Sequence, residues 1–349
     1  MESNAQNIID NNIIIDGLFH TLFTDHPPTQ GNTDIIDLLI DGGVTAISTT
    51  VVSDKYKSNL NSFLEEVYNF WLLEETFSER VLIVHNYGDL VKAKKENKLG
   101  IILSLQGADS IEHDLRYVTL LHKLGVRIIQ ITYNQRNNLG DGVFEPNDLG
   151  LTRFGQQAIY EMNRLGIVVD LSHVGHKTSL DAIETSTDPV IFSHSNVKKL
   201  CDNPRNLSDE QIKAATEKGG IIGLCPHSVF CIKDNSSRPT VDDFIDHIEY
   251  VMNLTGKDDH VGIGTDRWMR PTMGYEIVRK EFEQTLPGFF GSFSGNEKQV
   301  KGFNYYDEWE NLIETLLKRN FTNNQISKIL GGNLSRLFQQ IWKNNSIES

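Results

Sequence analysis

Short apolar runs rich in Ile, Val and Leu alternate along most of the chain with longer segments whose apolar residues recur about every 3.6 positions. Runs of this kind are typical of parallel β-strands buried on both faces. The pattern predicts nine strands, at Asn12–Asp16, Val44–Thr50, Arg80–His85, Leu99–Leu105, Val126–Tyr133, Ile167–Ser172, Val190–Ser193, Gly220–Leu224 and His260–Gly264.

The segments between the strands show the spacing of amphipathic helices. Clear examples are Ile111–Leu124, Phe154–Leu165, Thr178–Thr185 and Val241–Asn253. Glycines stand where these helices should end before the next strand, at Gly125, Gly166 and Gly219. Strand–helix alternation at this spacing predicts a parallel sheet, and we expect an α/β fold of the TIM-barrel, (β/α)8 type, somewhat distorted.

Eight strands close such a barrel, so one of the nine candidates is in excess. We assign Arg80–His85 as an extra short strand or as no strand at all. A doubly wound open sheet is the alternative architecture. No GxGxxG follows an early strand, so the dinucleotide-binding signature that would support the open sheet is missing.

No change of composition divides the 349 residues, and we expect residues 1–349 to form a single domain. The longest stretch without periodicity runs over about 267–306 and includes LPGFFGSFSG. Such stretches are often lids or binding loops, with disorder as the alternative. From Trp309 onward the pattern predicts two or three extra C-terminal helices that close the barrel.

Charge and cysteine usage narrow the class of partner and the compartment. The formal charge of −14 argues against nucleic acid and anionic membrane as partners, since both need a basic surface. No secretory signal and no apolar run of about eighteen residues are visible, so no membrane insertion is expected. The cysteines, without CxxC spacing, are typical of reduced thiols in a cytoplasmic protein: Cys201, Cys225 and Cys231.

Chemistry in a barrel collects where strands end, at the carboxyl-terminal face. His173 ends the strand that reads IVVDLSH, and His194 ends VIFSH, the next predicted strand along the chain. Histidines at matching positions of successive strands can converge on one metal ion. We therefore interpret His173 and His194 as metal ligands, whereas a single histidine at a strand end would more often be structural.

Three further side chains are candidates for the same site. Asp266 ends VGIGTD and could accept a proton from water and pass it to a leaving amine, or it could merely cap a helix. His20 follows the first strand and could reach the same metal if it faces the barrel interior. Arg205, in DNPRNLSDEQ, has the planar guanidinium that binds a carboxylate, or caps a turn. Of the other histidines, we place His227 alone near the site.

The chain resembles the membrane (renal-type) dipeptidase family, whose members are zinc peptidases with an amidohydrolase-like barrel. The motifs that carry the resemblance occur in the family's order: YNQRNNLGDGVFE, LTRFGQQAIYEMNRLGIVVDLSHVG, PVIFSHSN, PRNLSDEQI, VGIGTD and GGNLSRLF. The resemblance spans Ile13 to about Phe338. It implies a homodimer that splits dipeptides at a two-zinc site.

The resemblance also implies roles for single residues. The histidines that bind the second zinc in the family match His173 and His194. The catalytic aspartate of the family matches Asp266, and its carboxylate-binding arginine matches Arg205. The substrate-binding histidine of the family is replaced here by Tyr133, so Tyr133 becomes the candidate for that position.

The ligands of the first zinc depart from the family pattern. The family opens with DGHND, whereas this chain has Asp16-Gly17-Leu18-Phe19-His20, so Leu18 stands in place of a ligand histidine and His20 in place of a ligand aspartate. Gln106 takes the place of the bridging glutamate. Two zinc ions about 3.5–4 Å apart repel each other and need anionic ligands between them. We therefore expect one Zn²⁺, bound by His173, His194 and Gln106 together with water. His20 is a candidate third imidazole ligand.

The leading hypothesis is a metal-dependent hydrolase of a dipeptide or related small amide that bears a free carboxylate. Metal-activated water is the nucleophile in this hypothesis, Asp266 the general base and acid, and Arg205 and Tyr133 the groups that bind substrate. One alternative is a barrel enzyme that acts on another C–N bond of a small amino-acid derivative. Another is a non-catalytic descendant that binds a small ligand.

Overall fold

A computed structural model of the chain describes residues 4–21, 34–53, 59–233, 237–268, 279–280, 289, 293–306 and 308–342. Eight parallel strands form the central ring, in the order of the chain: β1 (Ile15–Thr21), β2 (Ala46–Ser53), β4 (Leu99–Gln106), β5 (Val126–Gln130), β6 (Val168–Asp170), β7 (Ile191–Phe192), β8 (Ile221–Leu224) and β9 (Val261–Ile263). The predicted TIM-type barrel is confirmed.

The ring closes through a short strand that the sequence pattern did not predict. Strand β10 (Arg267–Trp268) follows β9 after three residues and pairs in parallel with β1, with Phe19 opposite Arg267. The extra candidate at Arg80–His85 contains a real strand, β3 (Val81–Ile83), which pairs with β4 on the outside of the closed path. The interpretation of that run as a short additional strand is confirmed.

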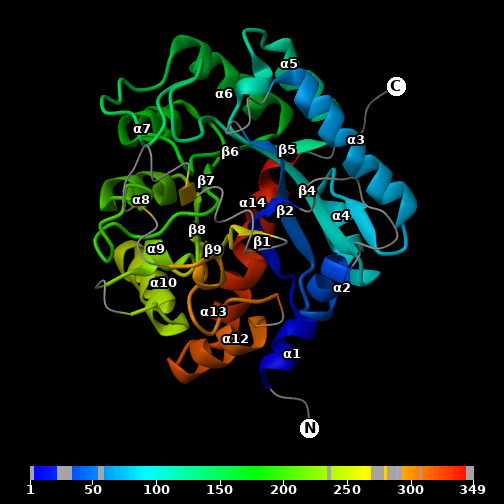
Figure 1. Ribbon diagram of the computed structural model, residues 1–349, viewed down its shortest axis with the longest axis vertical. Coiled ribbons are helices and arrows are strands. Elements are labelled where there is room, and N and C mark those ends of the chain that lie inside the picture. The colour runs from blue at the N-terminus through cyan, green and yellow to red at the C-terminus, as the bar shows by residue number, and fades with distance from the viewer. Residues whose placement is uncertain are drawn as a thin grey trace.

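Helices surround the ring, as Figure 1 shows. They are α1 (Asn4–Asn11), α2 (Asp34–Asp41), α3 (Leu60–Thr76), α4 (Tyr87–Lys95), η2 (Asp109–Ile111), α5 (Arg116–Lys123), α6 (Arg153–Leu165), α7 (His176–Thr185), α8 (Asp209–Glu217), α9 (Ser228–Cys231), α10 (Val241–Thr255), η3 (Gly295–Glu297), α12 (Trp309–Lys318), α13 (Asn323–Ser327), η4 (Lys328–Gly332) and α14 (Asn333–Ile341). The extra C-terminal helices predicted from Trp309 onward are present.

Local signals fix where several of these helices begin and end. The Thr152 hydroxyl accepts a hydrogen bond from the Gly155 N–H at the start of α6. The same helix ends at Gly166, whose φ of 77° lies in the left-handed region that favours glycine. Ser208 and Gln211 form a reciprocal capping box at the start of α8. The predicted helix Phe154–Leu165 is present as α6, whereas the predicted Ile111–Leu124 is divided into η2 and the shorter α5.

Helix α14 packs across the amino-terminal end of the barrel and lies in the middle of the ring in Figure 1. It packs Leu334, Leu337 and Phe338 against the apolar residues with which the strands begin: Ile15, Ala46, Ile102, Ile128, Val168, Ile191 and Ile221. This contact seals one end of the barrel. Polar side chains of the strands therefore collect at the opposite, carboxyl-terminal end.

Part of the stretch at about 267–306 lies outside the described residues, including most of LPGFFGSFSG. The described part, 293–306, packs onto the loops that follow β8 and β9. Among the described residues, none of the helices combines the length and apolar character needed to cross a bilayer.

Candidate active site

The predicted site residues lie at the carboxyl-terminal ends of the barrel strands. Gln106 is the last residue of β4, and Tyr133 follows β5. His173 follows β6, His194 follows β7, and Asp266 follows β9. Because parallel strands all end on the same face of the barrel, the strand order alone directs these side chains toward one region.

Three residues of this region hold a backbone conformation that is unfavourable for a side chain. His173, Asp266 and Asn134 have φ values of 64°, 49° and 62°, in the left-handed region. Such a conformation typically costs about 1–3 kcal/mol and persists where surrounding contacts enforce it. Strain of this kind clusters at functional sites.

The rings of His173 and His194 meet directly. Their Nε2 atoms lie 2.8 Å apart, and both side chains are buried. The His173 Nδ1–H donates to Asn134 Oδ1 at 2.7 Å, because an amide oxygen can only accept. The opposite nitrogen of the ring, Nε2, therefore carries a lone pair.

The same logic fixes the tautomer of His194. The Ser193 hydroxyl donates to Asp170 Oδ2 at 2.6 Å, so it accepts from His194 Nδ1–H at 2.7 Å. Asp170 is itself anchored by the N–H groups of Ser193 and Ser172, at 2.9 and 3.0 Å. A carboxylate, a hydroxyl and an imidazole thus form a chain that turns the lone pair of His194 Nε2 toward His173.

Two imidazole lone pairs that face each other repel unless a cation lies between them. The separation of 2.8 Å is less than twice a zinc–nitrogen bond of about 2.0–2.1 Å, so both nitrogens can bind one ion. Gln106 Nε2 lies 3.3 Å from His194 Nε2, and Gln106 Oε1 accepts from the Thr50 hydroxyl at 3.0 Å. The two imidazole nitrogens fit a single metal ion, whereas the amide nitrogen of Gln106 offers only N–H donors, so Gln106 would bind the ion through its oxygen after the amide turns over.

Among the residues that the structure describes, other side chains do not rebuild the first-metal half of the site that the resemblance implies. Within the described residues, no group of three or more His, Cys, Asp or Glu side chains could hold a metal ion. Leu18 is buried, with 1% of its surface exposed, and its side chain offers no ligand. His20 lies close enough to influence the pKa values of His173, His194 and Asp266. Its predicted role as a ligand stays a prediction.

Burial sets the charge state of the imidazoles. Burial, aided by the positive charge of Arg205, holds the pKa of His173 and His194 well below the usual range. Burial likewise lowers the pKa of His227, whose charge neighbours include Asp266, to about 3. All three rings are therefore neutral at pH 7, which is the form that binds metal.

Arg205 is buried beside the imidazole pair. Its guanidinium donates to the His194 carbonyl at 3.0 Å and to the Ser195 hydroxyl at 3.2 Å. Its Nε has no hydrogen-bond partner, and no carboxylate pairs with Arg205 among the residues that the structure describes. Burial lowers its pKa to about 10, so it stays cationic at neutral pH. A buried guanidinium with spare donors is suited to bind an anion.

Asp266 and Tyr133 complete the region. The Asp266 carboxylate pairs with the ammonium group of Lys298 at 3.0 Å. Tyr133 stacks on the His173 ring, with centroids 4.3 Å apart and an angle of 26° between the planes. Seven residues were predicted from sequence: His20, Gln106, Tyr133, His173, His194, Arg205 and Asp266. In the structure six of them lie in this region through contacts or at strand ends, and His20 lies close enough to act on it electrostatically.

Several residues of the region escaped the sequence analysis. Asn134, Asp170 and Ser193 each lie within three residues of a predicted site residue, so strand-end position could have indicated them. Lys298 has no such local signal, because it follows a long stretch without periodicity. Only its contact with Asp266 reveals it.

Comparisons with known proteins find relatives of the chain both by sequence and by fold. Residues 4–273 and 277–348 match the family described as Membrane dipeptidase (Peptidase family M19). An uncharacterized dipeptidase of Schizosaccharomyces pombe is 31% identical over 265 residues, which are 74% of this chain and 56% of that protein. The dipeptidase tcpJ of Claviceps purpurea is 27% identical over 269 residues, 76% of this chain and 57% of that protein.

This chain thus spans little more than half the length of the curated relatives that it matches. Among solved structures, an amidohydrolase from Pseudomonas aeruginosa superposes with a TM-score of 0.84 at 32% identity. That match covers 97% of this chain and 99% of the other.

Proposed function

Because this chain belongs to the membrane dipeptidase family, peptidase family M19, we propose that it is a metal-dependent hydrolase of dipeptides or related small amides. The observation that carries the proposal is the buried pair of imidazoles, whose Nε2 atoms lie 2.8 Å apart with both lone pairs directed inward. Such a pair is suited to bind a metal ion.

In this proposal His173, His194 and Gln106 hold a single ion, with His20 as a possible further ligand. When bound, a metal ion lowers the pKa of a coordinated water and polarises the carbonyl that is attacked. Asn134 and the Asp170–Ser193 pair keep both imidazoles in the tautomer that binds metal. Zinc is the ion we propose, since imidazole ligands suit it and the family is one of zinc peptidases by resemblance.

The remaining polar residues act on substrate and proton. Asp266 is an ionised carboxylate at the strand ends, so it can accept the proton that the attacking water loses and return it to the leaving amine. Arg205 can bind the free carboxylate of the substrate through its spare donors. Tyr133, stacked on His173, is the candidate for a further contact with substrate.

An aromatic cluster beside Arg205 favours substrates whose carboxyl-bearing residue is apolar. The Arg205 guanidinium carbon lies 5.5 Å from the centre of the Phe230 ring. Phe289 makes edge contacts with both Phe230 and Phe144, at 6.5 and 5.5 Å between centroids. The Phe144 N–H donates to the Asn134 carbonyl, so the cluster reaches the imidazole side of the site.

A cytoplasmic homodimer completes the proposal. All three cysteines are buried free thiols, which suits a reducing compartment. The dimer is implied by the family resemblance, and light scattering of the purified protein measures it directly.

Metal content and turnover, measured on the same preparation, test the proposal. We expect protein purified without chelators to contain about one zinc per chain. It should hydrolyse simple dipeptides, lose this activity on chelation and regain it with zinc. Replacing both His173 and His194 with Ala should abolish metal binding and turnover together. Full turnover by that double variant, free of metal, would refute the mechanism.

A further inference from the structure

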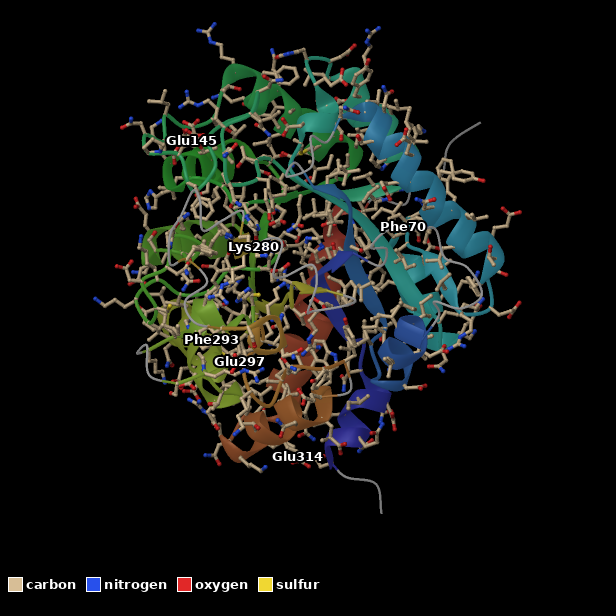
Figure 2. All side chains as sticks on the ribbon, viewed as in Figure 1. Phe70, Glu145, Lys280, Phe293, Glu297 and Glu314 are labelled. Carbon is tan, nitrogen blue, oxygen red and sulfur yellow. The ribbon has the colours of Figure 1, made fainter. Side chains whose placement is uncertain are left out.

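Lys298 reaches the active site from a segment far along the chain. It follows the short helix η3 (Gly295–Glu297), and Figure 2 labels Phe293 and Glu297 on this segment. The Lys298 carbonyl accepts from the Ser228 N–H at 2.7 Å, and the Val300 N–H donates to the Pro226 carbonyl at 2.8 Å. The backbone on both sides of the lysine is therefore fixed against the loop that follows β8.

The lysine side chain is directed inward, with 5% of its surface exposed. Its ammonium group lies 3.0 Å from Asp266 Oδ2 and also donates to the Asp266 main-chain carbonyl. A buried ammonium is costly unless it is paired and hydrogen-bonded. A surface lysine that had folded inward by chance would not have both partners on one residue of the site.

These contacts hold Asp266 at three points. The Asp266 N–H donates to the Leu18 carbonyl at 2.8 Å, while Lys298 binds both the carbonyl and the carboxylate. The residue has a φ of 49°, a conformation that needs such contacts to persist. The lysine therefore restrains both the backbone and the side chain of Asp266.

Resting on the proposed function, we propose that Lys298 is a positioning residue of the hydrolytic site, which fixes both the backbone and the carboxylate of Asp266. The groups that face Asp266 are Lys298 and the imidazoles of His194, His20 and His227. Of these, Lys298 supplies an ammonium charge, although burial lowers its own pKa. The sequence resemblance assigns no role to this lysine.

The electrostatics of Asp266 agree with the geometry. Burial raises the pKa of this carboxyl, and the charges of Lys298, His194, His20 and His227 together lower it by more, with Lys298 the largest of these. The net pKa lies below the usual range, so the carboxylate is ionised throughout the neutral and mildly acidic region. Without Lys298, the largest of the charges that lower the pKa of Asp266 would be lost, and this pKa would rise.

Substitution of the lysine in the full chain tests this role. Lys298→Met keeps the length of the side chain and removes the charge, Lys298→Arg keeps the charge, and exposed Lys301→Met is the matched control. Each protein is purified with its metal. Metal content, thermal midpoint, and kcat and KM for one dipeptide cleaved by wild type are measured between pH 4.5 and 8.5.

In Lys298→Met we expect kcat to decrease as the pH falls through the raised pKa of Asp266, since a protonated carboxyl cannot accept a proton. One unit of pKa change corresponds to about tenfold in the ionised fraction below the pKa. KM should stay near wild type and metal content should change little, because the ion pair and the hydrogen bond described above for Lys298 are both made to Asp266, and its influence on His194 is electrostatic. Lys298→Arg should restore most of the pH profile, and Lys301→Met should match wild type throughout.

A stability measurement keeps the test informative if Lys298→Met folds poorly. Asp266→Asn leaves the ammonium buried without a carboxylate, so its thermal midpoint should fall, and adding Lys298→Met should recover part of the loss. A pH profile of Lys298→Met that matches wild type would overturn the proposal, as would loss of metal in proportion to activity. If wild type cleaves no dipeptide at all, the proposed function fails instead, and the two failures are thus distinct.

Discussion

Replacing Ser193 with Ala removes the hydroxyl that joins Asp170 to His194. This hydroxyl donates to Asp170 Oδ2 at 2.6 Å and accepts from His194 Nδ1 at 2.7 Å, and Ser193 is buried. Alanine leaves the His194 N–H without this partner and removes one hydrogen-bond donor from Asp170. The imidazole then loses the contact that fixes both its tautomer and its orientation.

Two separate losses follow from this change. A buried donor left unpaired, together with a lost hydrogen bond to a charged group, lowers the free energy of unfolding by about 2–4 kcal/mol. Outer partners of ligand histidines typically contribute 10–100-fold to metal affinity, so we expect zinc binding to weaken by roughly that factor. The pKa of Asp170, already raised by burial, should rise further without the hydroxyl. The stability deficit should therefore be largest at neutral pH and shrink as the carboxyl protonates at acid pH.

Urea unfolding and competition with a fluorescent zinc chelator measure the two effects independently. Ser186→Ala is the matched control, because the buried Ser186 hydroxyl also makes two hydrogen bonds, to the Asp188 carbonyl and from Asn163, before β7 begins. The control should lose stability and keep its zinc affinity. Wild-type zinc affinity in Ser193→Ala, or an equal loss of affinity in both variants, would refute the reasoning.

Two further predictions concern the substrate. Arg205→Met should lower kcat/KM for dipeptides by about 10–100-fold, since a charge-assisted hydrogen bond contributes about 1.5–3 kcal/mol. The control Arg153→Met, at an exposed position, should leave kcat/KM unchanged. A C-terminally amidated dipeptide is already a poor substrate for wild type, so its kcat/KM should fall little further in Arg205→Met. An equal loss for both substrates would contradict carboxylate binding. Wild type should prefer Ala-Leu over Ala-Asp, and Phe144→Ala should narrow that ratio, by up to about tenfold. An unchanged ratio would show that the aromatic cluster does not face the substrate.

Part of the site could be predicted from sequence, because some of its residues stand directly at the ends of predicted strands. His173 and His194 end consecutive apolar runs, and side chains at the ends of neighbouring parallel strands must lie on one face of the sheet. The same reasoning located Asp266, whereas Gln106 was identified through the family resemblance. Strand-end position could not give the tautomer of His173, because this depends on Asn134, which lies 39 residues before His173.

Tertiary structure alone decided the rest. Strand β10 was missed, since its two residues carry no periodic pattern and pair with β1 from the opposite end of the chain. The sequence by itself determined the barrel, the face that carries the chemistry and the residue types gathered there, because periodicity and strand order are local properties of the chain. The contact between Lys298 and Asp266, and the close approach of the two imidazoles, arise from packing between distant segments, and no local pattern encodes such distances.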